Sequence, residues 1–446
     1  MTRADGRGGA ARDLPVLAVV YGRGAATPLG ILDTARGRCT VVFLGDLGDP
    51  LVAADLAPVS RSTRVVDTHG LTEGQLCALV VGLEPDGVVT FSDSSLRATA
   101  VVAKACGLPF HEPYTADVLV DKFRQREALA SAGVQSTACR LIRSAGDLAP
   151  ALAATGLPAV IKPRAGCSST DTCRVDSAEE LAARYEEFTE GVAEPRAYVL
   201  EEYLVGDPSA VGDFWGDYVS VESVTREGDT RTAGVTGKLP TAYPFRETGL
   251  FVPAELPEDL VEQVVRLERR ALRALGVREG VTHTEIKFTP EGPRVIEVNG
   301  RIGGGISDIM KRSSGVDLLA HAVEAALGAF DPPEPVLGLD GPDRRVAFQY
   351  LVSPPSDACV PGGVELLDDL YDIPGVDLVD VAVDPGWRAD WRAGTEWMLG
   401  TVYGSAPGFA ELRITLKAVQ DRMGAFWSEV EGRQRPARRS RTDPAG

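Results

Sequence analysis

The chain has 446 residues, of which 44% are hydrophobic and 25% are charged, and its formal net charge is −18 at pH 7. This length predicts about three domains. The acidic balance excludes a general nucleic-acid binder, which needs a basic surface. The seven cysteines are scattered and include no Cys-x-x-Cys pair, so the sequence predicts neither a disulfide framework nor a structural zinc site.

No apolar run approaches the roughly 20 residues that a membrane-spanning helix needs. A short apolar run at 14–20 follows several arginines, as in a signal peptide. However, residues 21–24 (Tyr-Gly-Arg-Gly) do not form a small-residue cleavage site. We therefore expect residues 1–13 to be a disordered leader and the protein to be cytoplasmic.

Four apolar segments alternate with helix-like stretches and predict an N-terminal α/β domain over residues 14–118, with a Rossmann-like parallel sheet. The expected strands are 14–20, 38–44, 63–67 and 87–91. Gly22-x-Gly24 begins a dinucleotide fingerprint, but Thr27 stands where a third glycine belongs. Asp93 follows the last strand, where it could face a ligand or cap the next helix.

A capped helix, a lysine-containing strand and a loop of small residues come next. Asp121 is the expected N-cap of a helix that stops at Gly133. Lys162 interrupts an apolar strand just before a proline, so it either extends into solvent or binds an anion. The loop at 164–170 is rich in N–H and O–H donors and could close over phosphates, although alone it would be an ordinary surface turn.

The segment 198–204 predicts a strand that runs into a turn at 206–208. Such a hinge suits a nucleotide, because it offers backbone groups to a base and an acidic side chain to a ribose. Further strands are expected at 219–225 and 232–238, and a helix at 257–275.

The stretch from His283 to Asp308 predicts a β-hairpin with its turn at 290–293, followed by a glycine-rich run. Glu297 and Asn299 share one strand face, and Glu285 can lie opposite them. Two carboxylates and an amide oxygen make a hard-oxygen site suited to Mg²⁺. Alone, the two glutamates could be solvent-facing residues of an amphipathic hairpin, but their pairing and the arginine and glycines that follow favour a phosphoryl site.

The last part of the sequence predicts a helix over 316–327 and a domain junction near Asp331. Residues 345–430 then read as a small α/β module, with strands at 345–352 and 397–405 and a helix over 409–427. The tail from 432 is expected to be disordered.

These motifs, in this order, resemble the ATP-grasp superfamily, specifically its carboxylate–amine ligases and among them bacterial L-amino-acid ligases that make dipeptides. The resemblance covers about residues 90–330. Its motifs are Asp-Lys at 121–122, Val-Ile-Lys-Pro at 160–163, the Gly-Ser loop at 166–169, Glu-Glu-Tyr-Leu at 201–204, Thr-Gly-Lys at 236–238, Phe-Arg-Glu-Thr-Gly at 245–249, and the hairpin's Thr-Glu-Ile-Lys and Glu-Val-Asn-Gly-Arg-Ile-Gly-Gly.

The resemblance implies an ATP-grasp fold within the α/β class, with an α+β nucleotide-binding part. The N-terminal domain would be followed by an ATP-grasp domain at 119–330, a small C-terminal α/β lobe at 331–431 and a disordered basic tail at 432–446.

The resemblance also implies roles for individual residues. The metal ligands would be Glu285, Glu297 and Asn299, and the catalytic side chains Arg301 and Lys238. The nucleotide-binding residues would be Lys122, Lys162, Gly166, Ser168, Ser169, Glu201, Glu202, Tyr203, Leu204 and Asp207. The substrate-binding residues would be Glu247, Leu250, Gly303, Gly304, Gly305 and Asp308. Two positions depart from the family pattern: Asp207 stands where Glu is usual, and Leu250 where dipeptide-forming members often have His.

The expected activity is ATP-dependent joining of a carboxylic or amino acid to an amine or amino acid through an acyl phosphate, with release of ADP and phosphate. ATP and Mg²⁺ or Mn²⁺, with two ions, are the implied cofactors. The implied partners are small amino-acid-like molecules and a second copy of the chain, not nucleic acid or a membrane. Three alternatives stay open: a biotin-carboxylase-like enzyme, a non-catalytic nucleotide sensor, and a Rossmann oxidoreductase that rests on Gly22-x-Gly24 and the strand rhythm.

Overall fold

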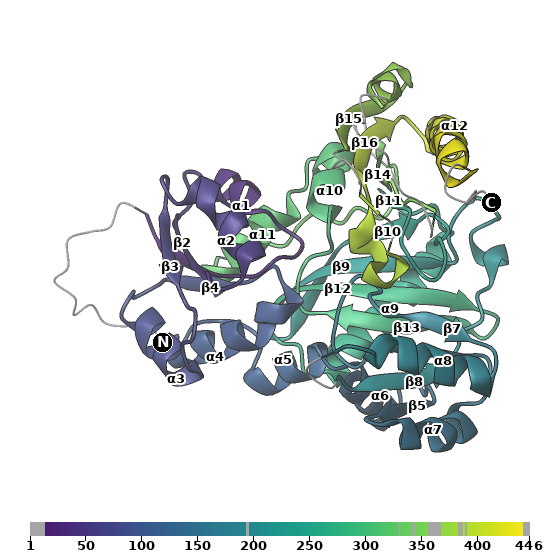
Figure 1. Ribbon diagram of the computed structural model, residues 1–446. Coiled ribbons are helices and arrows are strands. Elements are labelled where there is room, and N and C mark those ends of the chain that lie inside the picture. Colours follow the sequence, from purple (N-terminus) through teal and green to yellow (C-terminus); the bar gives the residue numbers. More distant parts are fainter. Residues whose placement is uncertain are drawn as a thin grey trace, which may run out of the picture.

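The computed structural model describes residues 14–439 except 193–195, 330, 341–343, 356–366, 382–386 and 389. The expected leader and the last seven residues of the expected tail lie outside the described residues. The described strands form three sheets, each with helices packed on it (Figure 1).

The N-terminal sheet is parallel throughout, as predicted, with strand order β3-β2-β1-β4. Its strands are β1 (Val16–Tyr21), β2 (Thr40–Gly45), β3 (Arg64–Asp67) and β4 (Gly87–Val89). Helices α1 (Pro28–Ala35) and α2 (Pro50–Leu56) pack on one face. Helices α3 (Glu73–Val81) and α4 (Leu96–Cys106) pack on the other. Since both faces are covered, the strands read as near-continuous apolar runs.

Two helices, α5 (Pro113–Leu119) and α6 (Lys122–Ser131), lead to a four-stranded antiparallel sheet. Asp121 caps α6 as predicted, because its carboxylate accepts the N–H groups of Phe123 and Arg124. The sheet has the order β5-β8-β6-β7 and is covered by α7 (Leu148–Thr155) and α8 (Ala178–Thr189). Its strands are β5 (Cys139–Ile142), β6 (Ala159–Pro163), β7 (Cys173–Val175) and β8 (Tyr198–Glu202).

The largest sheet has eight antiparallel strands in the order β13-β12-β9-β10-β11-β14-β16-β15. Its first five strands by position in the chain are β9 (Tyr218–Arg226), β10 (Asp229–Lys238), β11 (Gly249–Val252), β12 (Gly280–Thr289) and β13 (Gly292–Asn299). Helix α9 (Glu258–Ala274) packs on this sheet through a stripe of apolar residues spaced three or four apart: Val261, Val264, Leu267 and Ala271.

In its described residues, the C-terminal segment does not build a sheet of its own. Strands β14 (Val346–Leu351), β15 (Val376–Val381) and β16 (Gly400–Ala406) extend the large sheet, because β14 pairs with β11. Helices α10 (Ile306–Ser314) and α11 (Leu318–Ala326) follow the hairpin, and α11 packs against the N-terminal sheet. Helix α12 (Phe409–Arg439) runs beyond its expected end into the expected tail, whose Gln and Arg residues favour helix although Gly432 and Pro436 do not.

Short 3₁₀ helices connect these elements in the described part of the chain: η1 (Ala57–Val59), η2 (Asp93–Ser95), η3 (Ala145–Asp147), η4 (Pro208–Ala210), η5 (Asp368–Asp372) and η6 (Trp391–Trp397). Among the helices that the structure describes, none is long and apolar enough to cross a membrane.

Two glutamine side chains bind the outer edge of β13, which is one edge of the large sheet. Gln125 donates to the carbonyl of Val298 at 2.9 Å and accepts its N–H at 3.0 Å. Gln135 likewise donates to the carbonyl of Val295 at 3.0 Å and accepts its N–H at 2.6 Å. Each side-chain amide therefore acts as a substitute for a neighbouring strand.

Candidate active site

The hairpin strands β12 and β13 bring the two predicted glutamates together. Glu285 pairs directly with Glu297, and His283 with Asn299. Directly paired residues of antiparallel strands point to the same face, so the predicted alignment of Glu285, Glu297 and Asn299 on one face is confirmed. A bulge follows directly after Glu285 and shifts the register beyond it.

Lys122 lies next to this face. Its Nζ is 2.8 Å from Glu297 Oε1 and donates to the carbonyl of Gly166 at 2.7 Å. Burial works against the charge of Lys122, but Glu297 raises its pKa above the ordinary value. The lysine therefore stays charged, and it links the hairpin to the loop expected to close over phosphates.

Lys162 belongs to a buried cluster that includes Arg126, a residue that the sequence did not predict for the site. Lys162 forms an ion pair with Glu201, and the Nε of Arg126 lies 3.0 Å from Glu201 Oε2. Burial opposes the ionised carboxylate, but the two cations lower the pKa of Glu201 to about 2. Glu201 therefore orients Lys162 in this structure, rather than offering its carboxylate to a base.

The other hinge residues make ordinary structural contacts. Glu202 accepts the Ala138 N–H at 3.0 Å and pairs with Arg294 at 2.8 Å. Asp207 caps η4 by accepting the Ser209 N–H at 3.0 Å, so its carboxylate is engaged where a ribose contact was expected. Tyr203 has the Arg174 guanidinium over its ring at 4.7 Å, and Leu204 follows it in the predicted hinge.

Arg301 reaches the N-terminal domain. Its Nε and a terminal nitrogen lie 3.0 and 2.6 Å from one carboxylate oxygen of Asp93. Burial opposes its charge, yet Asp93 keeps the pKa of Arg301 above its usual value. Of the two sequence interpretations of Asp93, capping is not supported, because η2 has no side-chain cap and the carboxylate binds Arg301 instead.

Most of the residues predicted at the substrate end of the site have polar contacts or lie at the start of a helix, whereas one of them is buried in the core. Lys238 Nζ donates to Glu247 at 2.7 Å. Gly303 and Gly304 lead into α10, and Gly305 is its N-cap with φ of 71°. Asp308 lies in the first turn of that helix, where burial raises its pKa. Leu250, in contrast, is 3% exposed and belongs to the hydrophobic core, so it offers a substrate almost no surface.

A buried histidine supports the hairpin carboxylate. His283 Nδ1 lies 2.8 and 3.0 Å from the two oxygens of Glu222, and its Nε2 is 3.5 Å from Glu285. Burial alone would lower the pKa of His283, but Glu222 raises it to about 9. The resulting imidazolium lowers the pKa of Glu285, although burial opposes that shift. Glu285 is therefore an ionised oxygen donor.

The donor set fits a hard divalent cation. Glu285 and Glu297 are paired carboxylates, and Asn299 adds an amide oxygen. Ser220, opposite Glu285 on β9, has a buried hydroxyl with no hydrogen-bond partner in the described structure. Within the described ranges no group of three or more His, Cys, Asp or Glu could hold a metal, so the fit depends on the amide. A cation on Glu297 would compete with Lys122.

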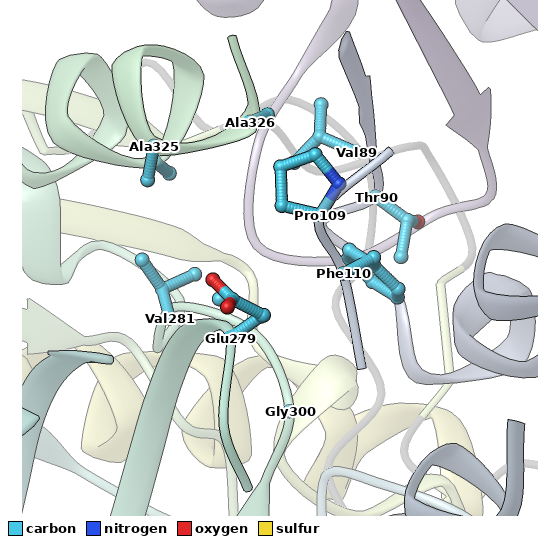
Figure 2. A pocket seen from close by; sticks show the side chains of 11 residues that line it. Val89, Thr90, Pro109, Phe110, Glu279, Val281, Gly300, Ala325 and Ala326 are labelled. Carbon is cyan, nitrogen blue, oxygen red and sulfur yellow. The ribbon is translucent and has the colours of Figure 1, made fainter. Parts of the chain in front are cut away.

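A small cavity lies elsewhere, between β4, α11 and the start of β12 (Figure 2). It has about 20 Å³ of free space, which is room for about one water molecule. Its lining is mostly apolar and includes Val89, Phe110, Val281 and Ala326, but none of the predicted site residues. It is too small for a nucleotide or an amino acid.

A family model described as "ATP-grasp domain" matches residues 155–309, which include the hairpin and Lys162. This part of the chain is therefore similar to ATP-grasp domains. The predicted ATP-grasp fold is confirmed over nearly the whole chain by its similarity to the crystal structure of an L-amino acid ligase from Bacillus licheniformis. That match has a TM-score of 0.68 and 22% identity, and covers 94% of this chain and 97% of the other.

Two curated relatives support the predicted resemblance to amino-acid ligases. Carnosine synthase 1 from Gallus gallus is 30% identical, over 55% of this chain and 28% of its own length. Alanine–anticapsin ligase from Bacillus subtilis (strain 168) is 29% identical, over 56% of this chain and 57% of its own length. The chain thus spans between 28% and 57% of the lengths of these two relatives.

Sequence reasoning missed four residues of the candidate site: Asp93 as the partner of Arg301, together with Arg126, Glu222 and His283. One signal was available for Glu222, since an acidic residue stands in the otherwise apolar and hydroxylated run of β9. The partners of Asp93 and Arg126 lie 208 and 75 residues away, so local patterns carry no trace of these pairs.

Proposed function

We propose that this protein is an ATP-dependent carboxylate–amine ligase. It would join a carboxylic or amino acid to an amine or amino acid through an acyl phosphate and release ADP and phosphate. The observation that carries the proposal is the convergence of Glu285, Glu297, Lys122 and Arg301, whose charges interact around one face of the hairpin. The similarity to carnosine synthase 1 and alanine–anticapsin ligase supports small amino-acid-like substrates.

The chemistry explains why this set of charges is useful. A carboxylate is a poor acyl donor, because its negative charge repels a nucleophile. Phosphorylation by ATP converts it into an acyl phosphate that an amine can attack. Transfer of the γ-phosphoryl group spreads charge over oxygens, so positioned cations provide most of the catalysis. Mg²⁺ held by Glu285, Glu297 and Asn299 would neutralise phosphate charge in this step.

Each of the predicted side chains would then have its own role in the reaction. Lys122 and Lys162 bind phosphate oxygens, and Arg301 stabilises the transferred group. The N–H groups at 303–305 face the developing oxyanion at the start of α10, where a helix favours negative charge. Lys238 and Glu247 orient the substrate. The loop at 166–170 excludes water, which would otherwise hydrolyse the acyl phosphate.

The proposal includes two bound Mg²⁺ ions and a homodimer, both by family resemblance. It also includes a cytoplasmic location, which the free state of the six cysteines in the described residues favours.

The test is phosphate release from ATP with panels of amino acids as donors and acceptors, followed by mass spectrometry. We expect a product whose mass equals the two substrates minus water. Release of ADP that depends on bicarbonate would point to a carboxylation reaction instead. ATP binding without turnover in any combination would contradict the ligase assignment and favour a nucleotide sensor.

A further inference from the structure

The short helix η6 (Trp391–Trp397) lies between two parts of the site that are far apart in sequence. On one side is the loop at 166–171, here called the flap. On the other side is the loop at 242–248, here called the substrate loop because it carries Glu247. Neither the sequence motifs nor the proposed chemistry assign η6 a role.

Backbone hydrogen bonds join η6 to the flap at two points. The N–H of Thr395 donates to the carbonyl of Ser168 at 2.7 Å, and the N–H of Asp171 donates to the carbonyl of Arg392 at 2.9 Å. An ion pair strengthens the second point, since Arg392 Nε lies 2.8 Å from Asp171 Oδ1 and the Asp171 side chain is only 6% exposed. Ser168 also donates its hydroxyl to Glu396 at 3.2 Å.

The flap has a conformation that needs such contacts. Ser168, Ser169 and Asp171 have φ of 56°, 58° and 45°, in the left-handed region that non-glycine residues rarely adopt. Such backbone persists only where the surroundings hold it. The approach of η6 is very close, because a Cβ at Gly394 would lie 2.0 Å from the Ser168 carbonyl oxygen.

The same segment, which is kinked at Gly394, also holds the substrate loop. The N–H of Glu247 donates to the hydroxyl of Thr395 at 3.0 Å. The carboxylate of Glu247 in turn accepts from Lys238 at 2.7 Å. Thr395 therefore binds the flap with its backbone and the substrate loop with its side chain.

We infer that Thr395 is a positioning residue that couples closure of the nucleotide flap to ordering of Glu247. Closing the flap against η6 fixes Thr395, and the fixed hydroxyl orders the substrate loop. Nucleotide binding would thus prepare the amino-acid-binding side of the site. The inference rests on the proposed function for what Glu247 contacts, but the coupling itself can be measured without knowing the substrate.

The test is hydrogen–deuterium exchange of the full chain with and without ADP and Mg²⁺. In the wild type, the nucleotide is expected to slow exchange in both the flap and the substrate loop. Thr395→Val keeps the backbone N–H and the side-chain shape but removes the hydroxyl. It should retain protection of the flap and lose about 2- to 10-fold of the protection at the Glu247 amide, the equivalent of one hydrogen bond. Thr395→Ser, which keeps the hydroxyl, should behave as the wild type.

A second variant weakens the contact between η6 and the flap. Arg392→Ala removes the ion pair to Asp171 and should reduce protection of the flap and the substrate loop together. The coupling is overturned if Thr395→Val keeps full nucleotide-dependent protection at Glu247, or if ADP and Mg²⁺ protect the flap alone in the wild type.

Steady-state kinetics separate this inference from the proposed function. In Thr395→Val the KM for the amino-acid substrate should rise about 2- to 10-fold, with the KM for ATP and kcat unchanged within twofold. If no substrate pair is turned over but the exchange pattern holds, the ligase assignment fails and the coupling stands. If turnover occurs but Thr395→Val and Thr395→Ser give equal results in both hydrogen–deuterium exchange and kinetics, the coupling is wrong and the ligase assignment stands.

Discussion

Each cation expected near the phosphates is held by a buried or half-buried carboxylate. Arg301 binds Asp93, Lys122 binds Glu297, and Lys162 binds Glu201. These pairs keep long side chains in one orientation before the proposed nucleotide binds. A charge left buried without its partner costs about 3–5 kcal/mol, so each pair also restricts which substitutions the site tolerates.

Arg301→Ala is expected to retain nucleotide binding and to lose about 10²–10³-fold in turnover, as for one lost oxyanion-type donor. The reason is that Arg301 would contact the transferred phosphoryl group and not the base. ATP affinity and the rate of phosphate release measure the two effects separately. Near-native turnover would remove Arg301 from its proposed role.

Asp93→Asn tests whether the carboxylate acts through Arg301. The substitution should lower kcat in the wild-type background, because the guanidinium loses its charged partner. It should have little further effect in Arg301→Ala, since residues that act through one contact are not additive. Equal losses in both backgrounds would show that Asp93 acts independently of Arg301.

At the scale of elements, the outer edge of β13 depends on side chains, not on a neighbouring strand, for its hydrogen bonds. Gln125 is 1% exposed and replaces a neighbouring strand at Val298. Gln125→Met keeps the length of the side chain but leaves a buried N–H and C=O without partners. We expect it to lower the free energy of unfolding by about 3 kcal/mol. Denaturant titration measures the change.

Gln135→Met is the matched control. Gln135 makes the same pair of hydrogen bonds with Val295 but is only partly buried, so water can replace it. Its loss of stability should be clearly smaller than that of Gln125→Met. Equal losses would mean that burial does not decide the cost at this edge.

The elements themselves were largely predictable from sequence, and the contacts between them were not. Alternation in the hairpin predicted the alignment of Glu285 with Glu297, because strand geometry is local. Capping likewise predicted the start of α6 at Asp121. Strand β15 was missed, since none of its residues is fully buried and a register shift between Val376 and Leu378 breaks the regular alternation of its apolar residues. Leu250 was assigned to the substrate from the family pattern, whereas its neighbours in the fold place it in the core.

At the scale of the whole molecule, one buried acid should make stability depend on pH. Glu268 on α9 is fully buried, and neither carboxylate oxygen has a hydrogen-bond partner among the described residues. Burial raises its pKa from 4.5 to about 8. Between these values the folded chain retains a proton that the unfolded chain releases. The free energy of unfolding should therefore fall as pH rises from about 4.5 to 8.

Glu268→Gln should remove this contribution, so its stability relative to the wild type should increase between pH 5 and 8, by at most about 1.4 kcal/mol per pH unit. Denaturant midpoints across this range measure it. Glu262→Gln, at an exposed position on the same helix, serves as the control and should show no such trend. A constant difference between Glu268→Gln and the wild type would contradict the assignment of a neutral buried acid.

The pairing of β11 with β14 has a consequence for dissecting this protein. Cutting the chain at the predicted junction near Asp331 would leave the β14-facing backbone groups of β11 unsatisfied and open to other chains, a known route to aggregation. It would also remove η6, and with it the surface on which the flap rests. The minimal independently folding unit is therefore expected to exceed the region that the family model covers, and truncation should yield insoluble material rather than a smaller folded protein.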